Sequence, residues 1–357
     1  MGNDKRILFT GGGTAGHVIV NLALIPYFLD SGWKIDYIGS KQGIERQLVE
    51  PIQGVTYHAI STGKLRRYVS IENMKDPFKV LKGVFDAWRI IGRVKPDIVF
   101  SKGGFVSVPV VIAARMRRVP TIIHESDMTP GLANKLATKF AKKIVTTFPE
   151  TINYLPQAKT EHVGAVIRED LFAGSQDAAY AWTTLHKDKP IILIMGGSIG
   201  SLKINYVIRE NLDHLLEKYQ IIHICGTGNI DESIKVEGYR QYEYVNEELK
   251  DILAISDYVV SRAGANAIFE FLALHIPMLL IPLPLSASRG DQIDNAKSFV
   301  NSGFAHMLME EEITTESFER AIENLITDGA AIKSRMKQED MQASREKVID
   351  LIETMAK

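Results

Sequence analysis

The sequence has one cysteine, no long apolar run and almost no net charge, and each scarcity excludes a class of protein. The single Cys225 cannot form an intrachain disulfide, which excludes a disulfide-stapled domain and fits a reducing compartment. No apolar stretch approaches the roughly 20 residues of a membrane span, and no signal-peptide core precedes the first strand-like run. The formal net charge of −1 gives no global field that would attract nucleic acid. We therefore expect a soluble or peripheral protein that uses a local patch for any polyanion or membrane.

Metal-binding patterns are also missing from the sequence. The histidines show no metal-ligand spacing, and no Asp-x-Asp pair is present to hold a metal–diphosphate complex. We therefore expect no metal site and no cofactor, so helix ends and arginine must neutralise any bound diphosphate.

Two halves of the chain share one pattern. With 357 residues, 45% hydrophobic and 24% charged, the composition suggests a globular enzyme of about two domains. Short runs rich in Ile and Val alternate with helical patterns, which predicts parallel sheets with helices on both faces. Each half opens on a strand, a glycine-rich turn and a helix. The strand-like runs are residues 7–10, 35–38, 98–100, 121–124 and 144–146, then 191–195, 221–225, 258–261 and 278–281.

The domain boundary is expected near residues 162–165. This predicts a first domain of residues 1–163 and a second of residues 164–336, with a last helix at about 337–357 packing back on the first domain. Ligands bind at the carboxyl ends of the strands in such sheets. Two sheets facing each other would therefore bring both glycine turns to one central cleft.

The first glycine-rich turn, Gly11–His17, satisfies the pattern G-x-G-x-x-G, and Asp36 lies 20 residues after Gly16. This is the fingerprint of a dinucleotide site, but it leaves other phosphate or sugar ligands open, as well as a purely structural turn. His17 begins the following helix, where the helix dipole favours a neutral imidazole. A neutral histidine is a competent general base, and a structural histidine is the alternative.

Two further segments of the first half follow predicted strands. Lys102–Ser107 comes after the run 98–100, and His124–Asp127 ends the run 121–124. Both lie at carboxyl ends of strands, so we expect them at the same edge of the sheet as His17.

The second half offers two helix starts for a phosphate. Ser198 lies in the turn after the strand 191–195, where backbone N–H groups suit a phosphate oxygen. The small residues Ala265 and Asn266 let the backbone approach a diphosphate at a second helix start. Glu270, one to two turns further, could accept hydrogen bonds from both ribose hydroxyls, or be an ordinary surface carboxylate. Arg168, at the interdomain junction, is a candidate cation.

Asp291, Gln292 and Asn295 form a polar cluster at the start of a later helix. Their amide and carboxylate groups can pair with sugar hydroxyls. They could equally form a helix cap with a solvated first turn.

The segment Lys75–Arg93 is basic and amphipathic. Such a helix can lie on an anionic membrane surface, although core packing is the alternative for most of its apolar stripe. The stripe is Phe78, Leu81, Val84, Phe85, Trp88 and Ile91, flanked by Lys75, Lys79, Lys82, Arg89 and Arg93, with Lys64, Arg66 and Arg67 upstream.

Together these segments resemble the MurG family of glycosyltransferase family 28 over nearly the whole chain. The matching segments, in the family's order and spacing, are residues 11–17, 102–109, 124–134, 163–170, 195–201, 261–270 and 291–296. The resemblance implies an α/β fold of the GT-B type, with two Rossmann-like, doubly wound parallel-sheet domains facing a central cleft. It implies an inverting transferase that moves N-acetylglucosamine from UDP-N-acetylglucosamine to the 4-hydroxyl of undecaprenyl-diphosphate-linked N-acetylmuramyl-pentapeptide. The reaction belongs to peptidoglycan synthesis at the cytoplasmic face of the cell membrane, and the UDP-sugar is a substrate rather than a cofactor.

The resemblance also implies roles for individual residues. The second domain binds the donor, through Arg168, Ser198, Val245, Ala265, Asn266, Glu270, Asp291, Gln292 and Asn295. The first domain serves the acceptor and the membrane, and its matching cleft residues are Thr14, Ala15, Gly16, Gly104 and Asp127. His17 matches the base, with Glu125 and Asp127 as alternatives. The chain departs from the family at Ala15, where a second glycine is common, and at Asp127 and Asp291, where some members carry asparagine and glutamine.

Three other interpretations stay open at this point. A glycolipid synthase acting on diacylglycerol shares the same architecture. An NAD(P)-dependent oxidoreductase would use the turn Gly11–Gly16 together with Asp36. A non-catalytic protein that binds a nucleotide sugar would bind the donor without releasing UDP.

Overall fold

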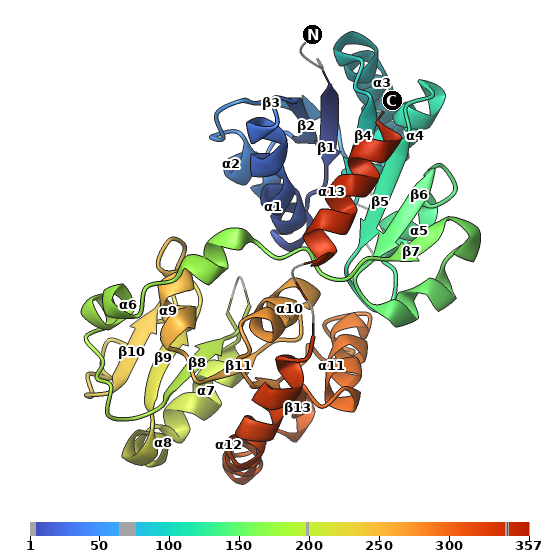
Figure 1. Ribbon diagram of the computed structural model, residues 1–357. Coiled ribbons are helices and arrows are strands. Elements are labelled where there is room, and N and C mark those ends of the chain that lie inside the picture. The colour runs from blue at the N-terminus through green and yellow to red at the C-terminus, as the bar shows by residue number, and fades with distance from the viewer. Residues whose placement is uncertain (1–4, 64–75, 198–199, 340, 342, 357) are drawn as a thin grey trace. The chain divides into compact units, whose positions relative to one another are not determined.

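The computed structural model describes residues 5–63, 76–197, 200–339, 341 and 343–356. The chain divides into two compact units, one made of Met1–Arg168 with Met341–Lys357 and the other of Glu169–Asp340. The first unit extends a few residues past the stretch 162–165 where we expected the boundary. Each unit is a parallel sheet with helices packed on it, as the alternating pattern predicts (Figure 1). No helix in the described ranges is long and apolar enough to cross a membrane.

The sheet of the first unit has the order β3-β2-β1-β4-β5-β6-β7, and its neighbouring strands pair in parallel. Its central strands are Ile- and Val-rich because helices cover both faces and leave no solvent-exposed side. The strands are β1 (Arg6–Thr10), β2 (Lys34–Ser40), β3 (Val55–Ile60), β4 (Ile98–Ser101), β5 (Thr121–Glu125), β6 (Lys143–Thr146) and β7 (Thr160–His162).

Helices of the first unit pack on two faces of this sheet (Figure 1). Side chains of α1 and α13 share one apolar cluster with β1, and those of α3 and α4 share another on the opposite face. The last helix therefore belongs to the first unit, although the whole of the second unit, Glu169–Asp340, precedes it in sequence. The helices are α1 (Gly16–Asp30), α2 (Ile44–Val49), α3 (Asp76–Val94), α4 (Ser107–Met116), α5 (Leu132–Ala137) and α13 (Ala343–Met355), with short 3-10 turns η2 (Pro149–Tyr154) and η3 (Gln157–Lys159).

Polar contacts hold α13 to α1 in addition to the apolar cluster. The Tyr27 hydroxyl donates to Glu353 Oε1 at 3.1 Å, and Arg345 Nε donates to the Ala23 carbonyl at 3.2 Å. Val348 and Ile352 are buried between them. Burying one such side chain contributes about 1.5–3 kcal/mol, so this helix stabilises the unit that carries the first glycine turn. It begins at Ala343, whereas we expected a longer helix from about residue 337.

The second unit has the sheet order β10-β9-β8-β11-β12-β13, again with parallel pairs. Its strands are β8 (Ile191–Met195), β9 (Gln220–Ile224), β10 (Tyr239–Tyr242), β11 (Tyr258–Ser261), β12 (Met278–Leu280) and β13 (Ala305–Met307). Its helices are α6 (Gln176–Thr183), α7 (Leu202–Glu210), α8 (Leu212–Lys218), α9 (Leu249–Ile255), α10 (Ala265–Ala273), α11 (Asp291–Asn301) and α12 (Thr315–Met336), with short turns η4 (Glu169–Ala173) and η5 (Glu310–Glu312).

Strand order reverses at one place in each sheet, and this places the sites. In the first unit the chain runs outward from β1 through β2 to β3, then returns to β4 on the other side of β1. In the second it runs outward from β8 through β9 to β10, then returns to β11. Loops after such neighbouring strands diverge and leave a crevice at the carboxyl ends, where ligands bind in open α/β sheets. Both glycine-rich turns lie at these switch points.

Candidate active site

The first glycine turn packs against the loop that follows β4. Gly13 has φ +91°, and Gly103 and Gly104 have φ +97° and +81°, conformations that favour glycine. A Cβ on Gly104 would overlap the Gly12 carbonyl and lie 3.3 Å from His17 Nδ1. The two loops therefore approach more closely than any other residue type would allow, and Gly104 lies against the histidine ring.

His17 is the second residue of α1 and is half-buried. Its Nδ1 lies 2.9 Å from Thr14 Oγ1, and its backbone N–H donates to the Thr14 carbonyl at 3.1 Å. Thr14 is exposed, and Ala15 and Gly16 complete the turn into the helix. The threonine contact orients the imidazole ring.

Glu45, at the start of α2, is the structural anchor of the turn and was not predicted from the sequence. It is completely buried, and its Oε2 accepts from Gly13 N at 3.1 Å. Its Oε1 accepts from Ser40 N at 2.9 Å and from Ser40 Oγ at 2.5 Å. Hydrogen bonds to a charged acceptor are the stronger kind, so a carboxylate on a neighbouring helix fixes the backbone of Gly13. No motif marks it, because the contact joins two elements distant in sequence.

Tyr37, on β2, holds the same turn from the interior of the first unit. Its buried hydroxyl donates to the Gly11 carbonyl at 2.8 Å, and Asn21 Nδ2 donates to that hydroxyl at 3.1 Å. Burial raises the pKa of Tyr37, so the hydroxyl keeps its proton and remains a donor. Residues of β2, α1 and α2 thus hold the turn in one conformation.

The loop after β5 is organised around Glu125. Its Oε1 accepts from Asp127 N at 3.1 Å, and its Oε2 accepts from Gly131 N at 3.0 Å and Asn134 Nδ2 at 2.9 Å. Glu125 is buried, whereas Asp127 is half-buried. Three donors on the carboxylate give Glu125 a role in shaping the loop that presents Asp127.

Lys102 and His124 lie buried behind these loops. Lys102 Nζ donates to Ser126 Oγ at 2.7 Å. Burial lowers the pKa of Lys102, although Glu125 and Asp127 act in the opposite direction. Burial and then the charge of Lys102 hold the pKa of His124 well below its usual value, so His124 is neutral and inside the protein.

Asp36 is not placed to bind a ribose. It lies in the middle of β2, opposite Leu8, and is 4% exposed. Its carboxylate is 2.6 Å from His58 Nε2 and 3.4 Å from Arg6 Nε. Because these partners occupy the acidic group that a dinucleotide site requires, the turn is not followed by a working dinucleotide pocket.

In the second unit the switch point is held by Arg262, another residue missed in the sequence. Its Nη2 donates to Ser201 Oγ at 2.7 Å and pairs with Glu310, and its Nη1 donates to the Ile281 carbonyl at 3.1 Å. Ser201 caps α7 by accepting from Ile204 N at 3.4 Å. The turn from β8 into α7 is thus tied to the ends of β11 and β12. Ser198, which we expected to bind a phosphate, lies outside the described residues.

The loop after β11 leads directly into α10. Gly264 precedes the helix, and Ala265 and Asn266 form its first turn, where N–H groups have no intrahelical acceptors. Glu270 lies in the next turn and is 8% exposed. The helix start and this carboxylate therefore lie on one element at the carboxyl edge of the sheet.

The remaining predicted donor residues frame this helix start. Asn295 is buried and donates from Nδ2 to the Ala263 carbonyl at 3.1 Å, and Gln292 Oε1 accepts from Leu283 N at 3.1 Å. Both side chains therefore brace loops of the crevice. The others lie at the start of α11 (Asp291), in the loop after β10 (Val245, buried) and at the end of the first of the two stretches that make up the first unit (Arg168).

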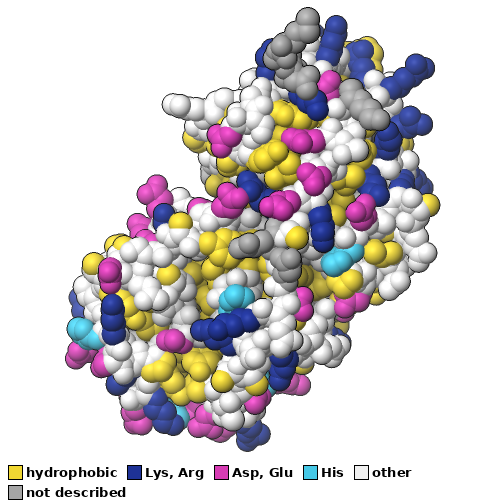
Figure 2. Space-filling view, in the orientation of Figure 1, with side chains coloured by type: hydrophobic (Ala, Val, Ile, Leu, Met, Phe, Trp, Pro, Cys, Tyr) yellow, Lys and Arg dark blue, Asp and Glu magenta, His cyan; other side chains and the backbone are white. Residues whose placement is uncertain are grey.

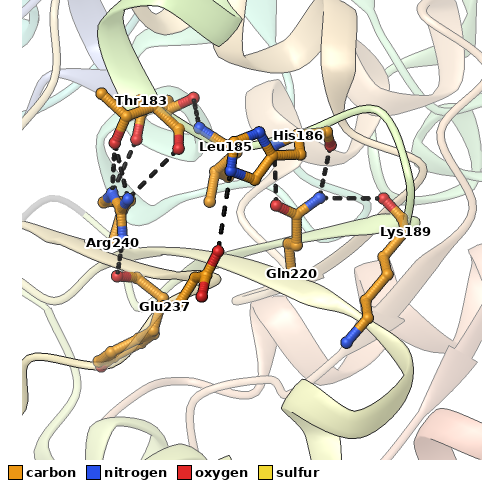
Figure 3. Close-up of polar contacts among 9 residues, drawn as sticks. Thr183, Leu185, His186, Lys189, Gln220, Glu237 and Arg240 are labelled. Carbon is orange, nitrogen blue, oxygen red and sulfur yellow. Dashed lines mark hydrogen bonds and ion pairs between the residues drawn. The ribbon is translucent and has the colours of Figure 1, made fainter.

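A polar pocket of about 260 Å³ lies in the second unit, on the side of the sheet opposite to the carboxyl ends of its strands. Gln220, the first residue of β9, bonds there to the backbone of His186 and Lys189, and His186 Nε2 lies 3.8 Å from Glu237 (Figure 3). These contacts lie at the amino ends of the strands. We therefore assign this pocket no part in the site.

Metal ligands do not gather in the described residues. No group of three or more His, Cys, Asp or Glu side chains there could hold a metal ion.

The apolar stripe of α3 divides between core and surface. Ile91 is buried, and Val84 and Trp88 pack against the same cluster. Phe78, Leu81 and Phe85 are 73%, 66% and 56% exposed. Lysine and arginine side chains gather along the edge of the first unit over α3 and α4 (Figure 2). Lys75, Lys64, Arg66 and Arg67 lie outside the described residues.

Two parallel-sheet units, each with a glycine turn at its switch point, have the architecture of the GT-B fold. The chain matches the glycosyltransferase family 28 N-terminal domain over residues 7–146 and the family 28 C-terminal domain over residues 191–354. A UDP-N-acetylglucosamine–N-acetylmuramyl-(pentapeptide) pyrophosphoryl-undecaprenol N-acetylglucosamine transferase of Oceanobacillus iheyensis is 60% identical over the full length of both chains. The transferase of that name from Staphylococcus carnosus is 55% identical over 97% of this chain and 96% of its own.

A solved structure of a MurG protein is also similar to this chain over nearly its whole length. The crystal structure of Acinetobacter baumannii MurG is 25% identical, covers 98% of this chain and 99% of its own, and superposes with a TM-score of 0.77. The chain belongs to glycosyltransferase family 28 and, within it, to the MurG family. The fold and family predicted from the sequence are thereby confirmed.

Proposed function

We propose that this protein transfers N-acetylglucosamine from UDP-N-acetylglucosamine to undecaprenyl-diphosphate-linked N-acetylmuramyl-pentapeptide, in peptidoglycan synthesis. The observation that carries the proposal is the 60% identity, over both whole chains, to a transferase named for this reaction. The chain matches both family 28 domain models. The similarity therefore extends over the N-terminal domain, which we assign to the acceptor, and over the C-terminal domain, which we assign to the donor.

The first unit supplies the acceptor side of the proposed reaction. A base takes the proton from the muramyl 4-hydroxyl as this oxygen attacks the anomeric carbon, and UDP leaves from the opposite face. His17 is the proposed base. If Nδ1–H donates to Thr14 Oγ1, which lies 2.9 Å away, Nε2 carries the lone pair that accepts the proton. The threonine thus selects the tautomer that the reaction needs.

The other acidic groups of this edge take supporting roles in the proposal. Glu125 shapes the loop through its three donors, and Asp127 faces the acceptor as the alternative base. Thr14, Ala15, Gly16 and Gly104 form the wall on which the lipid-linked diphosphate lies.

The second unit supplies the donor side. The start of α10 at Ala265 and Asn266 faces the diphosphate, and Glu270 accepts from the ribose hydroxyls. Arg168 and Ser198 complete the phosphate contacts, and the backbone of Val245 faces uracil. Asp291 and Gln292 line the sugar side, and the buried Asn295 supports them by donating to the Ala263 carbonyl. Helix ends and arginine then stabilise the charge that develops on UDP, without a metal. Turnover unchanged by excess EDTA would agree, whereas loss of turnover restored by Mg²⁺ would contradict the metal-free proposal.

We place the enzyme peripherally at the cytoplasmic face of the membrane. Phe78, Leu81 and Phe85 are exposed beside Lys79, Lys82 and Arg89 on α3, which is the pattern of a helix that inserts apolar side chains among anionic headgroups. Sedimentation with anionic vesicles tests this: binding should exceed that of Leu81→Glu and fall with salt.

A transfer assay with short-chain lipid-linked muramyl-pentapeptide and labelled UDP-N-acetylglucosamine tests the function. We expect a labelled disaccharide product and release of UDP. Transfer to diacylglycerol instead would favour the glycolipid synthase, and donor binding without UDP release would favour a binding protein. In the same assay His17→Ala should reduce kcat by about 10²–10⁴-fold with little change in UDP affinity. Normal turnover in that variant would remove His17 as the base.

A further inference from the structure

Lys102 joins the ends of three strands at the first switch point. It is the residue after β4, and its backbone N–H donates to Thr10 at the end of β1 at 2.9 Å. Its Nζ donates to Ser126 Oγ, just after β5, at 2.7 Å. The side chain is only 1% exposed. A lysine buried this deeply is rare, because removing an ammonium from water is costly unless other groups compensate.

The compensating charges come from the loop that Lys102 binds. Glu125 and Asp127 flank Ser126, and both attract the ammonium and so raise its pKa against the lowering effect of burial. His124 adds no positive charge, since burial keeps its pKa well below the usual value.

Titratable groups from other elements border the same place. His17 on α1 and Glu45 on α2 hold the glycine turn, and Glu150 precedes Thr151 of η2, whose hydroxyl donates to the Asp127 carbonyl at 3.2 Å. Lys102 itself is buried on the interior side of the loop.

We propose that Lys102 is a positioning residue for the acceptor: its buried ammonium binds Ser126 and holds the loop 125–127 at the first switch point. This deepens the proposed function and rests on it. Glu125 shapes the same loop through its three donors. Asp127 is half-buried and directly follows Ser126, so the hydrogen bond from Lys102 to Ser126 fixes the stretch of loop that presents Asp127.

The test compares Lys102→Met with the matched surface variant Lys139→Met, which removes the same charge from an exposed position of the same unit. We expect Lys102→Met to raise KM for the lipid-linked acceptor about tenfold and to leave KM for UDP-N-acetylglucosamine within about twofold. In an Asp127→Asn background, Lys102→Met should raise the acceptor KM less than it does in the native background, because the two residues act on one loop.

Unchanged acceptor KM in folded Lys102→Met would overturn the proposal. So would equal rises in both KM values, because a merely structural lysine would disturb both sites through the fold. Ser126→Ala provides a second route should Lys102→Met not fold. It removes the hydrogen bond, so acceptor KM should rise severalfold, and no rise would also overturn the proposal.

A measurement without substrate separates this inference from the proposed function. The Asp127 N–H donates to Glu125 Oε1 in the loop that Lys102 holds, so this amide should exchange its hydrogen faster in Lys102→Met than in Lys139→Met. Equal exchange rates would overturn the inference even if the transfer assay succeeds. An inactive wild type showing the expected difference would reject only the function.

Discussion

Glu45→Gln tests whether a buried carboxylate fixes the conformation of the first glycine turn. In the native protein its two oxygens accept three hydrogen bonds, from Gly13 N, Ser40 N and Ser40 Oγ. All three donors point at the carboxylate. Glutamine keeps the shape of the side chain but replaces one acceptor oxygen by an amide NH2 group. In one of the native contacts two hydrogen-bond donors would then face each other.

The structure gives the expected size of the effect. The amide oxygen should take the place of Oε1, where two donors converge, leaving the amide nitrogen opposite Gly13 N–H. A buried donor left unsatisfied costs about 1–3 kcal/mol, and the bonds that remain lose their charge assistance. Relief of the buried charge offsets part of this. We expect a net loss of about 2 kcal/mol from the first unit.

Tryptophan fluorescence during urea unfolding can measure this loss. Trp33 and Trp88 lie in the first unit, so a Trp182→Phe background restricts the signal to it. Glu50→Gln is the matched control, because Glu50 ends the same helix but is exposed and bonded to Arg46. Its midpoint should be unchanged, since exposed ion pairs contribute little.

Hydrogen exchange at Gly13 completes the test. Its amide should exchange faster in Glu45→Gln than in Glu50→Gln, because the protecting acceptor is lost. Equal stability of the two variants, or unaltered exchange at Gly13, would refute the idea that Glu45 holds the turn.

Three further predictions concern the second unit. Glu270→Ala should weaken UDP binding about tenfold in calorimetry while kcat for saturating donor changes less; an unaltered Kd would remove Glu270 from the ribose contact. Arg262→Met should release the turn after β8 and raise donor KM with acceptor KM unchanged, because Arg262 ties Ser201 to the ends of β11 and β12; a rise in acceptor KM alone would contradict this. Burial lowers the pKa of His223 from 6.5 to about 3, so the unfolded state binds its proton first as pH falls. Stability should then decline below about pH 6.5, by up to about 1.4 kcal/mol per pH unit, and His223→Gln should flatten the decline seen by Trp182 fluorescence.

The sequence predicted the central strands well because these strands are continuous apolar runs. The predicted run 191–195 is β8 and the run 258–261 is β11, and the other seven differ by a residue or two at an end. Four strands were not predicted: β3, β7, β10 and β13. Each lies at the edge of a sheet, where one side is open and polar residues are tolerated, so Tyr239–Tyr242 carries no apolar signature.

The residues that hold the site were harder to predict than those that line it. Gly13, His17 and Gly104 are marked by their position after a strand, and the structure brings them together at one switch point. Glu45 and Arg262 lie far in sequence from the turns they hold, and nothing in their local pattern distinguishes them from surface charges. Their roles depend on the tertiary fold, which local sequence patterns do not specify.

The packing around Glu45 restricts how this part of the chain can change during evolution. A Cβ on Gly12 or Gly43 would overlap the Glu45 carboxylate. A side chain on either glycine would therefore push the Glu45 carboxylate away from its donors, and shortening Glu45 alone would remove the acceptor of the Gly13 N–H. The three positions are expected to change together or not at all, so a lineage that loses Glu45 should carry compensating changes at the glycines. A double variant such as Gly43→Ala with Glu45→Asp should accordingly be better tolerated than Gly43→Ala alone.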